Sequence, residues 1–276
     1  MSVHPQFPAA AAVSHAGATA RFSIGITEAK KGWQVGFQPL GINILGSTIA
    51  VAAYFEPAVM LAEVSVGKNR LSLRNIRWVG GTVDAAGGRV RMFPDTVNWG
   101  GANRMETALI YSRDELGLIR NGPERKIFRI KYRDGAWHHD REVGFGIGAG
   151  MVHAATLTSD EALLVVESDL ALKDWIVRKY YADGKAFIRN KVDPFRYGIA
   201  ERRSDGAVFT VTDYRAKKKG VYRDNKLVVP GIAGNGIALL DDGAKGALVT
   251  CYGGGAPTSF KGVPGSIRYI PPRALD

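Results

Sequence analysis

Cysteine is almost absent from this sequence, since Cys251 is the only one among 276 residues. A single thiol excludes a framework of intrachain disulfides, and it also excludes a zinc site built from several cysteines. Cys251 stands within the apolar run GALVTCY, where a small core residue is expected more often than a nucleophile. We therefore predict that Cys251 is buried and unreactive.

Long apolar runs are also missing. No stretch approaches the roughly 18 apolar residues of a transmembrane helix, so we expect no membrane insertion. The N-terminal segment MSVHPQFPAAAAVSHAGATA has no basic region ahead of its apolar residues, and Pro5 and Pro8 interrupt it. These features are not those of a secretory signal peptide. We expect a cytoplasmic or virion-associated protein in which residues 1–20 form an extended N-terminal arm.

Recognisable catalytic motifs are scarce as well. The glycines between residues 144 and 150 alternate with other residues and lack the spacing of a dinucleotide-binding loop. No nucleophile elbow or phosphate-binding loop is present. The neighbouring acids Asp160-Glu161 and Asp241-Asp242 fall at predicted turns, where acidic side chains bind the backbone. The sequence thus predicts no catalytic residues.

Positive charge and glycine are abundant. The formal net charge is +11, and 34 residues are glycine. The charge favours nucleic acid, an anionic glycan or an acidic protein as partner, although no long basic run marks a binding site. The densest basic patch, Arg215 with Lys217–Lys219, precedes Gly220 and is typical of a solvated turn. Many glycines with little helical spacing of apolar residues indicate short strands and tight turns.

Four stretches of the chain share one pattern. Each has a small or polar start, an apolar run, a turn rich in Asp or Gly, and a second apolar or alternating run. The stretches are LGINILGSTIAVAAYF (40–55), MVHAATLTSDEALLVVESD (151–169), YGIAERRSDGAVFTVTD (197–213) and NGIALLDDGAKGALVTCY (235–252). Such turn residues permit tight hairpins, and the flanking residues favour strands. Each stretch therefore predicts a β-hairpin.

A second hairpin pattern recurs between these stretches, in KIFRIKYRDGAW, WIVRKYYADGKAF, GVYRDNKLVV and SIRYIPP. One tyrosine of each is spaced 49, 41 and 47 residues from the next: Tyr132, Tyr181, Tyr222 and Tyr269. Two hairpins per period of about 45 residues are typical of a four-stranded propeller blade. The tyrosines therefore predict one blade each.

The first 120 residues repeat less clearly. RFSIGITEAKKGWQVGF and AEVSVGKNRLSLRNIRWVGG resemble the second hairpin, whereas GGRVRMF and ETALIYSRDELG resemble outer strands. We predict an all-β propeller of five or six four-stranded blades, with residues 21–276 as its single domain. The C-terminal strand SIRYI is expected to complete the first blade, begun near residues 21–37, and so to close the ring.

The hairpins NGIALLDDGAKGALVTCY and YGIAERRSDGAVFTVTD resemble the blades of six-bladed NHL and gluconolactonase or senescence-marker propellers. The resemblance extends over roughly residues 127–270. In the lactonases of that group a Glu of the first blade, an Asn and an Asp hold a divalent metal in the central channel. The resemblance places Asn235 at the Asn position, with His153 and Tyr197 at the equivalent places in their blades. Glu28 stands in an ordinary turn instead of the first-blade motif.

Oxygen-rich coordination of Ca²⁺ requires six or more oxygens, including carboxylates, which this set lacks. We therefore predict no cofactor, with one divalent metal such as Ca²⁺ as the alternative. His153, Tyr197 and Asn235 are predicted to line the axial channel as binding residues. His138 is a weaker metal candidate, because it could meet His153 across a hairpin. Solvated histidines in a loop are the simpler interpretation.

Aromatic residues occur near several predicted loops, among them Trp137, Trp175, Phe195 and Tyr197, with Arg196 beside them. They could stack on a ligand or form hot spots of an interface, although packing of the tryptophans between blades is the simpler interpretation. We predict a non-enzymatic structural or binding propeller within a larger assembly, such as a virion or phage tail, that contacts protein partners or itself through the arm. The alternative is a lactonase-like hydrolase with a degenerate metal site.

Overall fold

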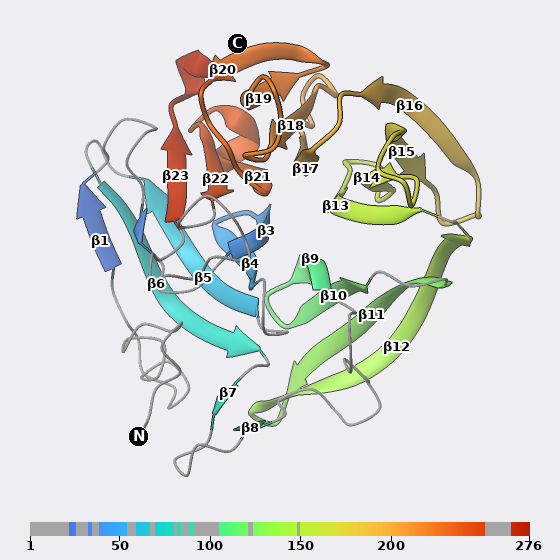
Figure 1. Ribbon diagram of the computed structural model, residues 1–276. Coiled ribbons are helices and arrows are strands. Elements are labelled where there is room, and N and C mark those ends of the chain that lie inside the picture. Colours follow the sequence, from blue (N-terminus) through green and yellow to red (C-terminus); the bar gives the residue numbers. More distant parts are fainter. Residues whose placement is uncertain are drawn as a thin grey trace.

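Five antiparallel sheets surround a common axis in the computed structural model, and Figure 1 shows them as the blades of a ring. The structure describes residues 22–25, 33–34, 39–53, 59–66, 70–79, 82–83, 89–90, 105–120, 124–147, 150–251 and 266–276. No α-helix occurs within these residues. The protein is therefore the all-β propeller that the sequence predicts, with five blades.

The strands of each blade follow one another from the axis outwards. Blade 1 comprises β3 (Pro39–Leu45), β4 (Thr48–Ala53), β5 (Val59–Val66) and β6 (Arg70–Val79), with β1 (Phe22–Gly25) added beside β6. Blade 2 comprises β9 (Met105–Ser112), β10 (Glu115–Arg120), β11 (Glu124–Arg133) and β12 (Ala136–Ile147). Blade 3 comprises β13 (Met151–Leu157), β14 (Leu163–Ser168), β15 (Trp175–Tyr180) and β16 (Ala186–Val192).

The last two blades have the same order. Blade 4 comprises β17 (Arg196–Glu201), β18 (Val208–Thr212), β19 (Gly220–Arg223) and β20 (Lys226–Pro230). Blade 5 comprises β21 (Gly236–Leu239), β22 (Ala247–Cys251), β23 (Ser266–Ile270) and β2 (Trp33–Gln34). The 3-10 turns η1 (Leu240–Gly243) and η2 (Pro272–Ala274) and a small sheet of β7 (Thr82–Val83) and β8 (Arg89–Val90) complete the described elements.

Blade 5 joins segments from the two ends of the chain. β23 pairs with β22 on one side and with β2 on the other, where Trp33 lies opposite Ile267 and Gln34 opposite Ser266. The strand SIRYI therefore shares a sheet with part of segment 21–37. The sequence RFSIGITEAKKGWQVGF does not form one hairpin, because β1 pairs in blade 1 and β2 in blade 5. The predicted arm, residues 1–20, lies outside the described residues.

Alternating side chains of the buried strands fill two different blade interfaces. In β14, Leu163 and Val165 pack towards blade 2, whereas Leu164 and Val166 pack towards blade 4. Side chains of a strand alternate between the two faces of its sheet, so an apolar run such as LLVV serves both interfaces. Five apolar clusters of this kind, one between each pair of neighbouring blades, close the ring.

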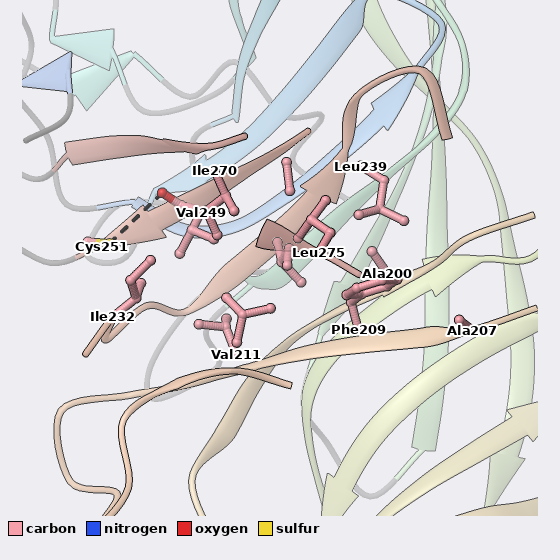
Figure 2. Close-up of a cluster of buried hydrophobic side chains, with 13 residues drawn as sticks. Ala200, Ala207, Phe209, Val211, Ile232, Leu239, Val249, Cys251, Ile270 and Leu275 are labelled. Carbon is pink, nitrogen blue, oxygen red and sulfur yellow. Dashed lines mark hydrogen bonds between the residues drawn. The ribbon is translucent and has the colours of Figure 1, made fainter. Parts of the chain in front are cut away.

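The interface between blades 4 and 5 shows this packing in detail (Figure 2). Phe209 and Val211 of β18 face Val249 and Cys251 of β22 in one cluster, and all four are buried. The Cys251 thiol donates a weak hydrogen bond to the Val249 carbonyl at 3.9 Å. Burial raises the pKa of the Cys251 thiol to about 11. The prediction that Cys251 is buried is confirmed.

The turn residues adopt the backbone that hairpins demand. Asp134 and Gly135 join β11 to β12 with φ of 51° and 81°, and Asp224 and Asn225 join β19 to β20 with φ of 46° and 70°. Two successive residues with positive φ match the right-handed twist of the strands that they connect. Asp-Gly and Asp-Asn are therefore the turn residues of these hairpins, as the sequence indicates.

The axis of the ring is closed by backbone contacts between glycines. A Cβ added to Gly198 of β17 would lie 2.7 Å from the Cα of Gly236 in β21. A Cβ added to Gly236 would lie 3.0 Å from the Cα of Gly41 in β3. Neither space admits a methyl group, so only glycine lets these three inner strands approach so closely. The short distances suit a ring of five blades, one fewer than in the family that the hairpins resemble.

The side chain of Asn43 ties three blades together beside the axis. Asn43 of β3 is 6% exposed, and its Nδ2 donates to Thr107 Oγ1 at 2.9 Å and to the Ala108 carbonyl at 3.0 Å, both in β9. It also donates to the Ala155 carbonyl of β13 at 3.1 Å. A single amide therefore fixes the relative positions of three inner strands.

All four predicted inner hairpins are present, as the first two strands of blades 1, 3, 4 and 5. The four spaced tyrosines lie in the third strand of blades 2 to 5 or directly after it. The segment ETALIYSRDELG is an exception, because it forms the inner hairpin of blade 2 and not outer strands. Within the described residues, no helix is long and apolar enough to cross a membrane.

Candidate functional site

The three predicted channel residues lie at the beginnings of inner strands. His153 is the third residue of β13, Tyr197 is the second of β17, and Asn235 directly precedes β21. The last residues of β3, β13, β17 and β21 border one cavity, so these strands run in the same direction along the axis. We call the end of the ring with His153, Tyr197 and Asn235 the start face, and the end with that cavity the end face.

His153 and Tyr197 are in contact across the interface of blades 3 and 4. The His153 ring stacks on Trp175 with 4.0 Å between centroids and meets the edge of Tyr197 at 5.0 Å. His153 Nε2 lies 2.8 Å from Ser168 Oγ, and the Ser168 hydroxyl donates to the Asp169 carbonyl at 2.9 Å.

The pair His153 and Ser168 has the spacing of a base and a nucleophile, but its surroundings oppose that role. Both residues are 3% exposed. Burial, together with the positive charge of Arg215, lowers the pKa of His153 to about 3. A general base is most effective when its pKa lies near the working pH. His153 is therefore a neutral, stacked residue of the interface and a poor proton acceptor.

Arg215 forms the solvent-facing part of this cluster. Its guanidinium lies 4.9 Å from the Phe195 ring centroid and 5.2 Å from that of Tyr197, and it also donates to the Tyr197 hydroxyl. Nε donates to the Asp213 carboxylate at 2.8 Å. The Arg215 side chain is 38% exposed. An arginine held between aromatic rings presents positive charge and flat apolar surface together, a combination common in binding hot spots.

A buried ionic group, which the sequence did not reveal, links blades 2 and 3. Glu167 of β14 accepts hydrogen bonds from Arg125 of β11 and from the Tyr180 hydroxyl at 2.8 Å. Arg178 Nε lies 3.1 Å from the other Glu167 oxygen. Arg125 and Glu167 are each 3% exposed. With this number of partners, Glu167 is a fully engaged structural carboxylate and offers no free oxygen pair for catalysis.

Arg196 is a second buried cation, although the sequence predicts it in a loop. It is 0% exposed and stands over the Tyr222 ring at 3.4 Å. Its guanidinium donates to Thr210 Oγ1 at 2.7 Å and contacts Asp193 at 3.4 Å. Burial lowers the pKa of the guanidinium from its ordinary value. Arg196 therefore packs within blade 4 and is not available to an external ligand.

Asn235 differs from its neighbours at the start face. It is 2% exposed, and neither Nδ2 nor Oδ1 of its side chain has a hydrogen-bond partner among the described residues. Its backbone N–H donates to the Thr250 carbonyl at 2.8 Å, which fixes the residue at the beginning of β21. A buried amide without partners is costly. Within the described residues, Asn235 makes no hydrogen bond to His153 or Tyr197.

The predicted pairing of His138 with His153 is not present. His138 is an exposed residue of β12, the outermost strand of blade 2, and pairs with Lys131. His153 belongs to the innermost strand of blade 3, in another sheet. The two strands do not form the hairpin that would bring them together. Glu28 lies outside the described residues.

The tryptophans whose side chains the structure describes pack between blades. Trp137 is 6% exposed at the interface of blades 1 and 2, and Trp175 is 2% exposed at that of blades 3 and 4. Within the described part of the chain, no group of three or more His, Cys, Asp or Glu side chains could hold a metal ion. The start face presents aromatic rings and the guanidinium of Arg215.

These features define a five-bladed β-propeller with a cationic and aromatic start face. No protein family model matches the sequence, and no curated protein matches it. Among solved structures, it is similar to a luciferin-regenerating enzyme, with 9% identity, a TM-score of 0.51 and coverage of 91% of this chain and 95% of that one. That likeness confirms the propeller fold expected from the hairpins.

Two further structures are similar to a lesser degree. Regucalcin from Agrobacterium tumefaciens, a calcium-binding protein, has 10% identity and a TM-score of 0.48, with coverage of 85% of this chain and 90% of that one. A protein of unknown function from Bacteroides caccae has 15% identity and a TM-score of 0.34. In that case the match spans about half of each protein, 54% of this chain and 54% of the other.

Proposed function

We propose that this protein is a non-enzymatic binding propeller that acts as a component of a protein assembly. The observation that supports the proposal is the contrast at the start face between buried groups and exposed ones. His153 and Ser168, which have the spacing of a catalytic pair, are sealed inside the blade interface. Arg215, with Phe195 and Tyr197 around it, is the part that reaches solvent.

The exposed group has the chemistry of a docking surface. Arginine and tyrosine are enriched among residues whose truncation weakens protein interfaces. Arg215 is already positioned by Asp213 and by two rings, so little side-chain freedom would be lost when a partner binds. The chain's net charge of +11 favours a partner with an acidic surface.

A metal-dependent lactonase is the second candidate, and one observation favours it. The unpaired amide of Asn235 stands where the family resemblance expects a metal ligand. The remaining described residues do not fit such a site. Tyr197 is bonded to Arg215 and His153 to Ser168, and within the described part of the chain no group of three or more His, Cys, Asp or Glu side chains could hold a metal ion. We therefore derive no hydrolytic step from these residues.

Native mass spectrometry of the untagged protein, before and after EDTA, distinguishes the two candidates. The proposal expects an oligomer without bound metal that dissociates when residues 1–20 are removed, while circular dichroism shows an unchanged fold. A monomer that retains one divalent ion and hydrolyses lactones when Ca²⁺, Zn²⁺ or Mn²⁺ is added would instead establish the hydrolase.

The role of the arm and the kind of assembly are narrower hypotheses. Self-association through residues 1–20 rests on the sequence of that segment, which suits the addition of a strand to the edge of a neighbouring sheet. A virion or phage tail rests on the same segment, and the comparisons with known proteins add no support to it. Nucleic acid or an anionic glycan as partner rests on the net charge alone.

A further inference from the structure

The loop between β18 and β19, residues 213–219, places a group of cations on the start face. Thr212 at the end of β18 pairs with Arg196 at the start of β17, so the loop begins directly at that face. Lys217–Lys219 are all exposed, and within the described residues none of them forms an ion pair. The loop's one acid, Asp213, is 2% exposed and pairs with Arg215. The three lysines therefore have no carboxylate partner of their own in the described part of the chain.

The backbone of this loop is held in place, although its lysine side chains are exposed. The Tyr222 hydroxyl donates to the Lys218 carbonyl at 2.9 Å, and the Gly231 N–H donates to the Lys219 carbonyl at 2.8 Å. A backbone that is already fixed loses little freedom when a partner binds. The loop therefore presents its cations in a prepared arrangement.

The loop between β14 and β15, residues 169–174, exposes a leucine at the same face. Leu170 is 71% exposed, the largest value among the exposed large apolar side chains of the described residues. Asp169 Oδ1 accepts the N–H groups of Lys173 and Asp174 at 2.6 and 3.1 Å, which closes the loop. A single exposed leucine is ordinary on a protein surface. It carries weight here because a fixed loop holds it on the face that bears the lysines.

Partly exposed aromatic rings connect the two loops. Trp175, directly after the first loop, donates through Nε1 to the Leu172 carbonyl at 2.9 Å. Its ring lies 5.9 Å from that of Phe195 and 5.4 Å from that of Tyr197, between centroids. Arg215 of the second loop contacts the same two rings. Leucine, rings and cations therefore belong to one surface over blades 3 and 4.

The charges of this surface do not balance. Loops 169–174 and 213–219, with residues 193–196, hold six basic and four acidic residues. Asp193 contacts the buried Arg196, and Asp169 accepts backbone N–H groups. The surplus of two positive charges falls to Lys217–Lys219, so the complementary partner is anionic.

From this combination we propose that the start face of blades 3 and 4 docks an acidic segment of a partner protein, with an aliphatic side chain among its carboxylates. The carboxylates pair with Lys217–Lys219, and the aliphatic side chain packs on Leu170. A single-stranded nucleic acid is less complementary, because its bases need open ring faces and the rings here already contact Arg215 and Trp175. The inference rests on the proposed role of the start face as a docking surface and adds the chemistry of the partner.

Fluorescence anisotropy of the full chain with the fluorescein-labelled peptide DEDLEDLED tests the proposal. We expect saturable binding that weakens as salt is added, because exposed charges are screened. Charge reversal of the loop, by Lys217→Glu, Lys218→Glu and Lys219→Glu together, is expected to lower the affinity about a hundredfold. Circular dichroism and thermal unfolding verify that this variant is folded.

The matched control reverses three exposed lysines at the end face, by Lys185→Glu, Lys226→Glu and Lys245→Glu together. It changes the net charge by the same amount, but we expect the affinity to stay within about twofold of the wild type, because distant charges are screened at physiological salt. An equal loss in both triple variants would mean that only the net charge attracts the peptide, and it would overturn the proposal.

The aliphatic contact is tested separately. We expect Leu170→Ser to lower the affinity about tenfold, as does the peptide DEDSEDSED in place of DEDLEDLED. Ala171→Ser, in the same loop, is the control and leaves the affinity unchanged. The proposal is overturned if DEDLEDLED does not bind at millimolar concentration, if Leu170→Ser has no effect, or if a short oligothymidylate binds more tightly than the peptide.

The outcomes separate this inference from the assembly role. Absence of peptide binding beside a metal-free oligomer that depends on residues 1–20 would overturn the inference alone. Peptide binding by a monomer that retains a metal ion and hydrolyses lactones would overturn the assembly role alone.

Discussion

Asn43 and Ala155 are 112 positions apart in the sequence, yet the side-chain amide of Asn43 donates to the carbonyl of Ala155 at 3.1 Å. The same nitrogen bonds two oxygens of blade 2, at Thr107 and Ala108. Blades 1, 2 and 3 therefore share one donor group beside the axis. In a ring held together by side-by-side apolar interfaces, this amide is a direct polar connection between blades that are not neighbours.

The first prediction concerns this amide. Asn43→Ala removes the donor and leaves three buried oxygens unsatisfied, so we expect the free energy of unfolding to fall by about 2–4 kcal/mol. Asn43→Asp is expected to cost more, because a carboxylate cannot donate to these oxygens. Thr107→Val removes only one acceptor and should cost less than either. Urea unfolding measures all three, and equal stability of Asn43→Ala and the wild type would contradict the shared role.

The second prediction concerns the glycines at the axis. Gly198→Ala places a methyl group 2.7 Å from the Gly236 backbone, and overpacking of this kind costs about 1–3 kcal/mol or more. Gly144→Ala in β12 is the matched control, since a Cβ there meets nothing within 4 Å. We expect thermal unfolding to separate the two variants clearly. Similar melting temperatures would show that the inner strands can move apart at little cost.

The third prediction concerns the buried ionic group. Glu167→Ala leaves Arg125 buried without its carboxylate, and loss of one partner of a buried pair costs about 3–5 kcal/mol. Asp183→Ala removes a partner of the exposed pair Lys185–Asp183, and its effect on stability should be small. Guanidinium unfolding of both variants checks the difference. If Arg125→Met with Glu167→Leu restores stability, the pair serves orientation of blades 2 and 3 more than stability.

The fourth prediction concerns pH. The pKa of His153 is lowered to about 3 in the folded protein and is near 6.5 in an unfolded chain. Between these values only the unfolded state binds the proton, so stability falls as pH decreases from about 6.5 towards 3. His153→Phe retains a ring against Trp175 but cannot titrate. We expect its stability to decline less than that of the wild type between pH 6.5 and 4, and parallel curves would refute the assignment.

The fifth prediction concerns Cys251. With a pKa of about 11 and 2% exposure, the thiol should resist iodoacetamide at pH 8 in the folded protein and react after unfolding in urea. Mass spectrometry gives the extent of modification in both states. Reaction of the native protein at the rate of a free thiol would mean that the interface of blades 4 and 5 opens readily.

Much of the fold could be predicted because a tyrosine recurs in the third strand of most blades or directly after it. Tyr132, Tyr181, Tyr222 and Tyr269 recur once per blade in blades 2 to 5. The third strand of blade 1, VMLAEVSV, has no tyrosine, so the first blade carries no such signal. The blade number stayed open for this reason, and because β2 contributes only two residues to blade 5.

The candidate site was predicted less completely. His153 and Tyr197 were named because the family resemblance places them at positions equivalent to Asn235, and both lie near the start of an inner strand. Arg125 was missed and Arg196 was assigned to a loop, because a buried arginine has no local sequence mark that distinguishes it from a surface one. Glu167 left a weak signal, as a charged residue at the end of the buried run LLVVES.

The cavity at the end face was not foreseen, because its lining comes from the inner hairpins of four blades and the end of β5, which only the closed ring brings together. Asp241 and Asp242 were correctly assigned to a turn, and both have positive φ, of 49° and 52°. Their position on a cavity rim depends on β3 and β17, which are distant in the sequence. The closing of the ring, and not the local sequence of any one hairpin, brings these residues together.

The pairing of β2 with β23 fastens the ring through two residue pairs, Trp33 with Ile267 and Gln34 with Ser266. Every other strand pairing described within the five blades has three or more such pairs. This is the shortest strand pairing described within the blades, so it is expected to open at lower force than the others when tension is applied between the two ends of the chain. Optical tweezers should therefore record an early, low-force event before the blades unravel.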